Sequence, residues 1–233
     1  MADPAVDRRS LIAGGAMLAA AAATTVASAQ AAPASGPAFT PQPLPLPFDP
    51  KAVPGLSEKL LVSHHDNNYV GAVKRLGAIS AQMTALDPAT APGFTINGLK
   101  REELIAWNSM ILHELYFSSL GAPTRPSAKL ARAIERDFGS DARWRAEFSG
   151  MGKALGGGSG WVILTWSARD KRLVNTWAAD HTMTLAGGAP LVALDMYEHA
   201  YAMDFGAKAA AYVDAFMGAL NWSAADTAFS RIA

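Results

Sequence analysis

Histidine and carboxylate side chains are the chemically active groups of this sequence. The chain has five histidines and no cysteine. Without cysteine there is no disulfide bond, thiolate zinc site, iron–sulfur cluster or thiol nucleophile. A metal ion would therefore have to be held by histidine, aspartate and glutamate. The histidines, each in an otherwise apolar stretch, are His64, His65, His113, His181 and His199.

One short motif contains both a carboxylate and an imidazole: Asp195 precedes His199 by four residues. This spacing is weak by itself, and a lone histidine is more often a satisfied core or surface residue than a ligand. Taken together the histidines favour a shared site, since burying several imidazoles without partners is costly. One metal ion would satisfy them, and the carboxylate would cancel part of its charge.

The histidines nearest the N-terminus, His64, His65 and His113, fall in two predicted helices. Apolar residues recur every three or four positions from Ser57 to Leu86, which predicts a helix that ends before Pro88. A second helix is expected over 99–120, and the turn-rich connection indicates an antiparallel hairpin. The apolar stripe expected to pack in this second helix is Leu104, Trp107, Ile111 and Leu115.

Two shorter helices are expected next, over 127–138 and 141–153, the latter with Ser140 as its N-cap. The glycine-rich run 156–160 then breaks the chain. A phosphate-binding loop is disfavoured there, because no Lys-Ser/Thr pair follows and the next element is a strand.

Strands follow the glycine-rich run. Trp161–Trp166 and Arg172–Trp177 are β-branched and aromatic around a turn, which predicts a β-hairpin. A third strand is expected over Pro190–Leu194, and a last helical region over about 197–220.

Residues 1–29 have the pattern of a removable export signal. Arg8-Arg9 precedes an uncharged alanine-rich run, Leu11–Ala29, whose small residues at the end suit a signal peptidase. A membrane anchor is the alternative, although Gly14-Gly15 interrupts the run. The paired arginines favour the bacterial twin-arginine route. We therefore expect a periplasmic protein with no membrane association once the signal is removed.

Composition limits the remaining possibilities. Prolines recur through 30–47, which predicts an extended linker. Half of the residues are apolar and 17% are charged, enough for a buried core. The 20 basic and 20 acidic residues give a formal charge of zero, which argues against a nucleic-acid partner.

Five segments together resemble the iron/manganese superoxide dismutases. Asp195–Tyr201 is similar to the family's Asp-x-Trp-Glu-His-Ala-Tyr signature, and Gly158–Trp161 to its Gly-Ser-Gly-Trp. His113–Phe117 resembles its His-x-x-Tyr-Trp, Leu44–Phe48 its Leu-Pro-x-Leu-Pro-Tyr, and Asn221-Trp222 its closing Asn-Trp. Order and spacing agree along nearly the whole chain.

The resemblance implies an α+β fold. An N-terminal antiparallel helical hairpin over 48–125 would be followed by an α/β domain over 126–233, with a three-stranded antiparallel sheet that helps to bind the metal. It also implies that the protein converts superoxide to oxygen and hydrogen peroxide by redox cycling of one iron or manganese ion per subunit.

The implied metal ligands are His64, His113, Asp195 and His199. His65 stays an alternative to His64. The separation between Ser57 and His64 matches that between the helix-start residue and the ligand in the family, which favours His64. His65 lies four residues before Tyr69, so these two side chains share one helix face, which favours His65. The ligand set does not decide between iron and manganese.

The chain also departs from the family pattern. Its first-helix motif is three residues shorter, the histidine at the substrate entrance has no counterpart, and Ala202 stands where that histidine's cross-subunit partner is tyrosine. The signature tryptophan is Tyr197, and Tyr69 is expected to supply the active-site phenol that organises proton delivery. Glu198 and His199 keep the pair that joins two subunits in the family, which implies a homodimer.

His181 stands in the loop after the predicted β-hairpin. Most family members have a glutamine that donates to the metal-bound solvent, and Ser109, at one of its two positions, is too short to do so. His181 falls on the other position, and an imidazole N–H can replace the amide donor. Asp180 would take that place under a one-residue shift, but an ionised carboxylate cannot donate. A plain surface histidine is the remaining alternative.

Two other functions stay open. A hydrolytic zinc enzyme with three histidines would leave Gly158–Trp161 unexplained. A superoxide-dismutase-like metal-binding protein with lost or altered activity is compatible with the missing entrance residues.

Overall fold

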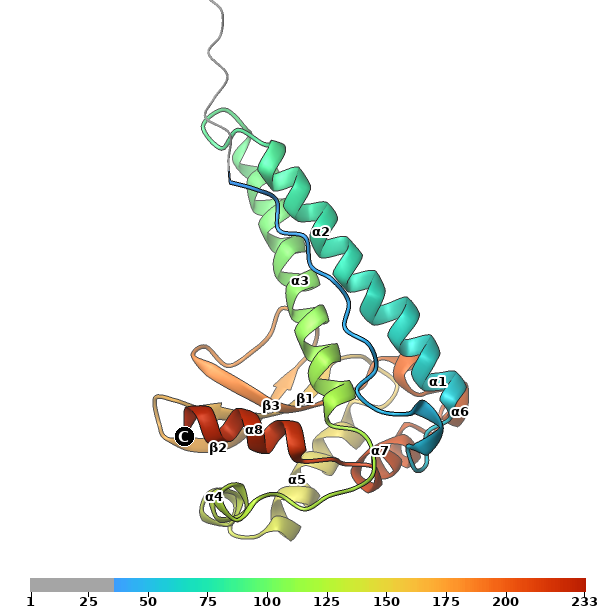
Figure 1. Cartoon of the computed structure of the whole chain (residues 1–233). Coiled ribbons are helices and arrows are strands. Elements are labelled where there is room, and N and C mark those ends of the chain that lie inside the picture. Colours follow the sequence, from blue (N-terminus) through green and yellow to red (C-terminus); the bar gives the residue numbers. More distant parts are fainter. Residues whose placement is uncertain (1–35) are drawn as a thin grey trace, which may run out of the picture. The chain divides into compact units, whose positions relative to one another are not determined.

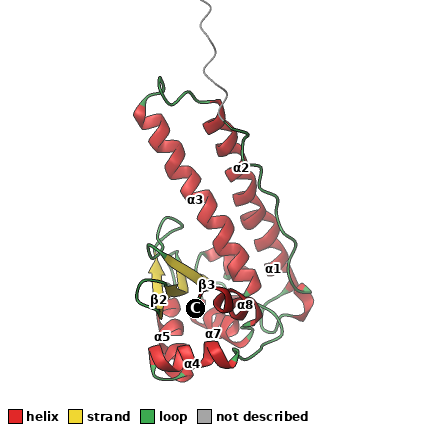
Figure 2. Ribbon diagram, turned by 60° about the vertical axis from the view of Figure 1, so that its left-hand side comes forward, coloured by secondary structure: helices red, strands yellow, loops and turns green. Residues whose placement is uncertain are grey.

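A long helical hairpin opens the computed structural model, which describes residues 36–233; the predicted export signal lies outside the described residues. Helix α1 (Glu58–Ser63) begins at Ser57, whose hydroxyl accepts a hydrogen bond from the Leu60 N–H. The chain continues through a π-helical turn, η2 (His64–Tyr69), into α2 (Val70–Ala85). Helix α3 (Gly93–Ser118) returns beside α2, as Figures 1 and 2 show. The predicted hairpin is confirmed.

The structure corrects the hairpin in two places. The first helix is not uniform, because η2 widens it where His64 and His65 stand, and such π turns are frequent at functional sites. Helix α3 begins at Gly93, six residues before the predicted start, because Pro92 rather than the later Asn-Gly pair precedes its first turn.

The predicted apolar stripe of α3 is wrong for three of its four residues, and Leu115 alone packs against the core. Leu104, Trp107 and Ile111 are 47%, 39% and 36% exposed, and the buried face instead contains smaller and polar residues. This face consists of Ala106, Ser109, Leu112, His113, Tyr116 and Phe117. The helix therefore turns its histidine inwards.

An irregular segment, residues 36–47, runs along the hairpin (blue in Figure 1). Phe39 stacks on Trp107 with ring centroids 5.2 Å apart, and its N–H donates to the Ser80 hydroxyl over 2.7 Å. Leu44 donates its N–H to the Tyr69 hydroxyl over 2.8 Å. No helix or strand forms over these residues, and these contacts hold the segment against the hairpin.

The second half is built around a small sheet. Helices α4 (Ala128–Phe138) and α5 (Asp141–Ala154) lie where expected, each with a serine N-cap, Ser127 and Ser140. Strands β1 (Trp161–Ser167), β2 (Arg172–Ala178) and β3 (Gly188–Asp195) form an antiparallel sheet of order β2-β1-β3. The predicted α+β fold class and three-stranded sheet are confirmed.

The C-terminal helical region is more broken than expected. It divides into η3 (Glu198–Ala200), α6 (Ala202–Phe205) and α7 (Ala209–Gly218), because Gly206 adopts a positive φ of 54° and ends α6. A further helix, α8 (Ser223–Ile232), was missed by the sequence analysis.

Hairpin and sheet share one hydrophobic core. Leu60 and Leu112 from the hairpin belong to the same buried cluster as Trp161 and Leu194 from the sheet. Gly160 lets the chain pass close to β2, since a Cβ atom there would stand 2.2 Å from the Ala178 carbonyl oxygen. None of the helices within 36–233 has the length and apolar character required to span a membrane.

Candidate metal centre

Four elements bring the predicted ligands together. His64 opens the π-helical turn η2, and His113 lies on the buried face of α3. Asp195 is the last residue of β3, and His199 follows on η3. Residues 131 positions apart in the chain thus meet at one point, and their donor atoms all lie within 4.8 Å of one another.

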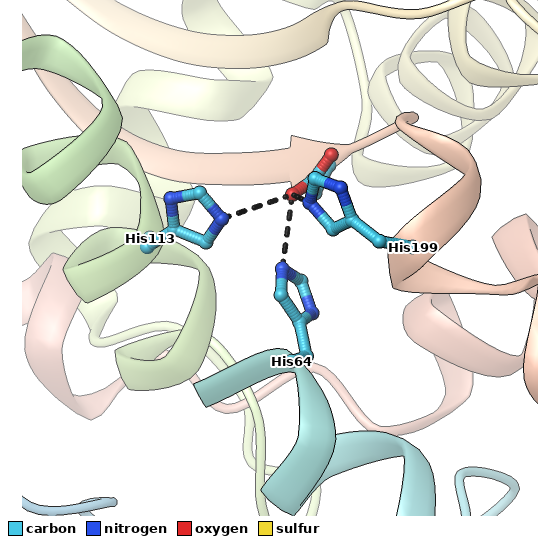
Figure 3. Close-up of side chains that lie close together, drawn as sticks. His64, His113 and His199 are labelled. Atoms are coloured by element: carbon cyan, nitrogen blue, oxygen red, sulfur yellow. Dashed lines mark hydrogen bonds and ion pairs between the residues drawn. The ribbon is translucent and has the colours of Figure 1, made fainter. Parts of the chain in front are cut away.

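One carboxylate oxygen is the centre of this cluster. The Oδ2 atom of Asp195 lies 3.1 Å from Nε2 of His64, 3.2 Å from Nε2 of His199 and 3.6 Å from Nε2 of His113. Figure 3 shows the three labelled imidazoles converging on it. Two donors that each lie about 2.1 Å from one ion are between about 3.0 and 4.2 Å apart, so these distances suit a common ion.

Electrostatics favour an ionised Asp195 beside neutral imidazoles of His64 and His113. Burial raises the pKa of Asp195, but its hydrogen bonds with His199 and His64 lower it more, so that the net shift is downwards. Burial lowers the pKa of His64 and brings that of His113 to about 3, in spite of the nearby carboxylate. Three neutral nitrogens and one carboxylate form a ligand set suited to a redox-active metal.

His113 has the tautomer that metal binding requires. Its Nδ1 donates to the Ser109 carbonyl oxygen over 2.6 Å, so the lone pair of the neutral ring is on Nε2. That Nε2 is buried and has no hydrogen-bond partner among the described residues. A buried acceptor without a partner costs free energy unless a ligand engages it. The residues therefore fit a metal ion.

His65 points away from the cluster. Its Nε2 bonds the Leu44 carbonyl oxygen and its Nδ1 bonds Asp66, each over 2.8 Å. The structure thus favours His64 over His65 as the ligand.

Within residues 36–233, no hydrogen bond joins Tyr69 to the four clustered side chains. Its hydroxyl donates to Glu114 over 2.9 Å and accepts from Leu44, and burial raises its pKa to about 12. Its expected part in proton delivery has no direct contact to support it.

His181, in contrast, lies beside the cluster. Its ring centroid is 6.1 Å from that of His113, and its Nδ1 accepts a hydrogen bond from the Trp161 indole over 3.0 Å. Because Nδ1 accepts, the neutral ring has its proton on Nε2. Burial lowers the pKa of His181, which keeps the ring neutral. Asp180 instead accepts hydrogen bonds from Thr182.

Two tyrosines near the cluster were given no role at the site in the sequence analysis. The Tyr212 hydroxyl donates to the backbone carbonyl of Asp195 over 2.8 Å and lies 3.3 Å from the Tyr116 hydroxyl. The Tyr116 ring centroid is 4.9 Å from that of His64. Tyr116 follows His113 by three residues, on the same helix face, and this spacing was the available signal. No local pattern marks Tyr212.

Comparison with known proteins agrees with this centre. The family model for the C-terminal domain of iron/manganese superoxide dismutases matches residues 126–228. A protein of Cupriavidus metallidurans named superoxide dismutase [Fe] is 67% identical over 80% of this chain and 94% of its own length. Superoxide dismutase [Mn] 1 of Halobacterium salinarum is 34% identical, over 81% of this chain and 94% of its own. With a buried three-histidine, one-aspartate cluster and relatives of this similarity, the chain belongs to the iron/manganese superoxide dismutase family.

Proposed function

We propose that this superoxide dismutase works at the cluster of His64, His113, Asp195 and His199, with one iron or manganese ion bound per subunit. The observation that carries the proposal is the convergence of the three Nε2 atoms on Asp195, where His113 has a buried lone pair without a partner. The relatives include proteins named for iron and for manganese, so both ions remain in the proposal.

The bound ion and the four side chains have different roles in the proposed reaction. A bound iron or manganese ion supplies the redox chemistry by alternating between its trivalent and divalent states. Over a full cycle two superoxide anions and two protons become one oxygen and one hydrogen peroxide. Since the four side chains contribute only one negative charge, a bound trivalent or divalent cation leaves the site positive, which attracts the small anionic substrate.

His181 is proposed to hold solvent in the site. The Trp161 indole occupies Nδ1 of His181, which leaves the Nε2–H available as a donor. A donor of this kind orients a water or hydroxide molecule beside the ligands, and such neighbours tune both the reduction potential and the acidity of the site.

The enzyme is proposed to act as a homodimer. Glu198 is exposed, and the side chain of His199 is 28% exposed although its Nε2 faces Asp195. No described group bonds the Nδ1 of His199, so a carboxylate from a second copy can reach it. In the family resemblance, Glu198 supplies that carboxylate.

The enzyme is proposed to act in the periplasm. Support comes from Arg8-Arg9 and the uncharged run that follows. Replacing both arginines by lysine is expected to keep the protein in the cytoplasm, as cell fractionation followed by immunoblotting would show. Unchanged export would point to another route.

The proposed chemistry is tested by metal analysis and a superoxide assay on the mature protein. We expect close to one iron or manganese ion per subunit and dismutation that disappears when the metal is removed. Zinc at full occupancy would favour a hydrolytic enzyme, and a metal-loaded protein without dismutation would indicate a changed function. Either result would contradict the proposal.

A further inference from the structure

Tyr197 stands between two functional imidazoles. Its ring is nearly parallel to that of His181, with centroids 4.9 Å apart and an angle of 13° between the planes. It is also nearly parallel to the ring of His199, with centroids 5.4 Å apart and an angle of 16°. Stacked rings at such distances attract one another and restrict each other's orientation. The phenol ring thus joins a predicted ligand to the proposed solvent donor.

Tyr197 is itself held at several points. Its backbone N–H donates to Oδ1 of Asp195 over 2.8 Å, the carboxylate oxygen that does not face the histidine cluster. The Trp161 ring lies 6.3 Å away. Backbone and ring are therefore fixed with respect to both the ligands and the start of the sheet.

His181 depends on its neighbours for its orientation, because it lies in an irregular loop. The Asn108 side chain donates to its backbone carbonyl oxygen over 2.6 Å, which fixes the main chain to α3. The Trp161 indole holds Nδ1, and the rings of Trp161 and His113 lie 5.6 and 6.1 Å from the His181 ring at angles of 51° and 45°. The Tyr197 ring is the nearest of the three and the one that lies nearly parallel to the imidazole, so it restricts the ring plane most directly.

We propose that Tyr197 is a positioning residue that sets the ring plane of His181, and through it the direction in which the Nε2–H points. The inference rests on the proposed role of His181. It assigns the aromatic ring of Tyr197, rather than its hydroxyl, to this task. An indole is larger than a phenol ring, so a tryptophan at position 197 would need more space beside the two imidazoles.

Four variants separate ring, hydroxyl and size. Tyr197→Phe keeps the ring and is expected to retain parental dismutation within about twofold. Tyr197→Ala removes the stack and is expected to lower dismutation about tenfold, since small misplacements of a positioned group are costly. Tyr197→Trp is expected to be impaired, and His181→Gln in the same chain should restore part of its activity, because a flexible amide needs less space than a ring.

The decisive experiment combines Tyr197→Ala with His181→Ala. Dismutation, the reduction potential of the bound ion and metal content are measured for both single variants, the double variant and the parent. Trp177→Ala, which removes an exposed aromatic ring from β2, is the matched control. If Tyr197 acts through His181, the double variant will match His181→Ala, and Tyr197→Ala will shift the potential in the same direction as His181→Ala with full metal content.

The possible results distinguish the positioning role of Tyr197 from the solvent-donor role of His181. Multiplying losses in the double variant, with His181→Ala itself impaired, would overturn the positioning role and leave the role of His181 intact. A fully active His181→Ala variant would remove the proposed solvent donor and the positioning role with it. Loss of metal in Tyr197→Ala would assign the ring to His199 and overturn the inference.

Discussion

At the scale of single residues, hydrogen bonds distinguish His113, which faces the centre, from His65, which does not. His113 gives its Nδ1 proton to the Ser109 carbonyl and so presents Nε2 inwards. His65, one residue from a predicted ligand, uses both nitrogens on Leu44 and Asp66 and is directed outwards. The side chain of His65 is 12% exposed, whereas that of His64 has no exposed surface.

His181→Ala is expected to keep its metal and lose activity. The four clustered side chains are untouched, so metal content should equal that of the parent, while dismutation falls roughly tenfold to a hundredfold. The reduction potential should rise, because a donor that stabilises solvent next to the oxidised ion lowers it. Metal analysis, an activity assay and redox titration measure the three quantities.

His181→Gln is the matched variant, because it restores an N–H donor, and it should recover part of both properties. Parental activity and an unchanged potential in His181→Ala would show that His181 is not the solvent's partner.

The limits of sequence reasoning are visible at the same scale. Histidine and aspartate types, together with the family resemblance, gave the four clustered residues, because each lies in a recognisable motif. The orientation of Tyr69 could not be inferred, since the first-helix motif departs from the family pattern and Tyr69 ends a π-helical turn. A wider turn changes the direction of every side chain that follows, and no local pattern announces it.

At the scale of elements, the helical hairpin shows that apolar periodicity predicts a helix without deciding which of its faces is buried. The pattern of α3 indicated an apolar stripe at Leu104, Trp107 and Ile111, but the core lies on the other face. Phe39, from the irregular segment before the hairpin, partly covers Trp107. An apolar stripe indicates that a helix has a packing partner but does not identify the partner. The Ser140 N-cap and the strand hairpin depend on neighbouring residues and were predicted well.

Asp137 provides a test of how α4 is joined to β2. Burial raises its pKa, but hydrogen bonds from Arg136 and from the Leu173 N–H lower it more, for a net decrease. A depressed pKa contributes stability above the unfolded value of 3.8, and this contribution is lost as pH falls through the folded pKa. Asp137→Asn should therefore lower the free energy of unfolding by about 1.5 kcal/mol at pH 7.

Urea unfolding at pH 7 and at acidic pH measures this effect, and the difference from the parent should shrink as the pH falls below the folded pKa. Asp141→Asn, which removes an exposed ion pair with Arg145 within α5, is the control and should change stability by less than about 0.5 kcal/mol. An equal loss at both pH values would show that the Asp137 carboxylate charge is not responsible.

At the scale of the whole molecule, one site draws on both halves of the chain. His64 and His113 come from the hairpin, whereas Asp195 and His199 come from the sheet end and the turn after it. Since the two halves share a core, folding itself assembles the ligands. Binding that occurs only in the folded state stabilises that state, so removing the metal should lower resistance to unfolding.

The proposed homodimer gives a prediction at this scale. Glu198→Ala should weaken association about tenfold or more, because it removes a charge-assisted hydrogen bond to His199 of the second copy. Analytical ultracentrifugation over a concentration series measures the dissociation constant. Glu135→Ala, an exposed glutamate of α4, is the control and should leave it unchanged. A parent protein that sediments as a monomer at micromolar concentration would contradict the dimer.

The most direct test of the central claim is the iron and manganese content of His113→Ala, measured per folded subunit together with its dismutation. The account predicts that this variant loses both stoichiometric metal and activity, because the buried Nε2 that faces Asp195 is gone. His65→Ala, measured in parallel, is predicted to keep both. A His113→Ala protein with full metal occupancy and parental dismutation would contradict the assignment of the cluster as the catalytic metal centre.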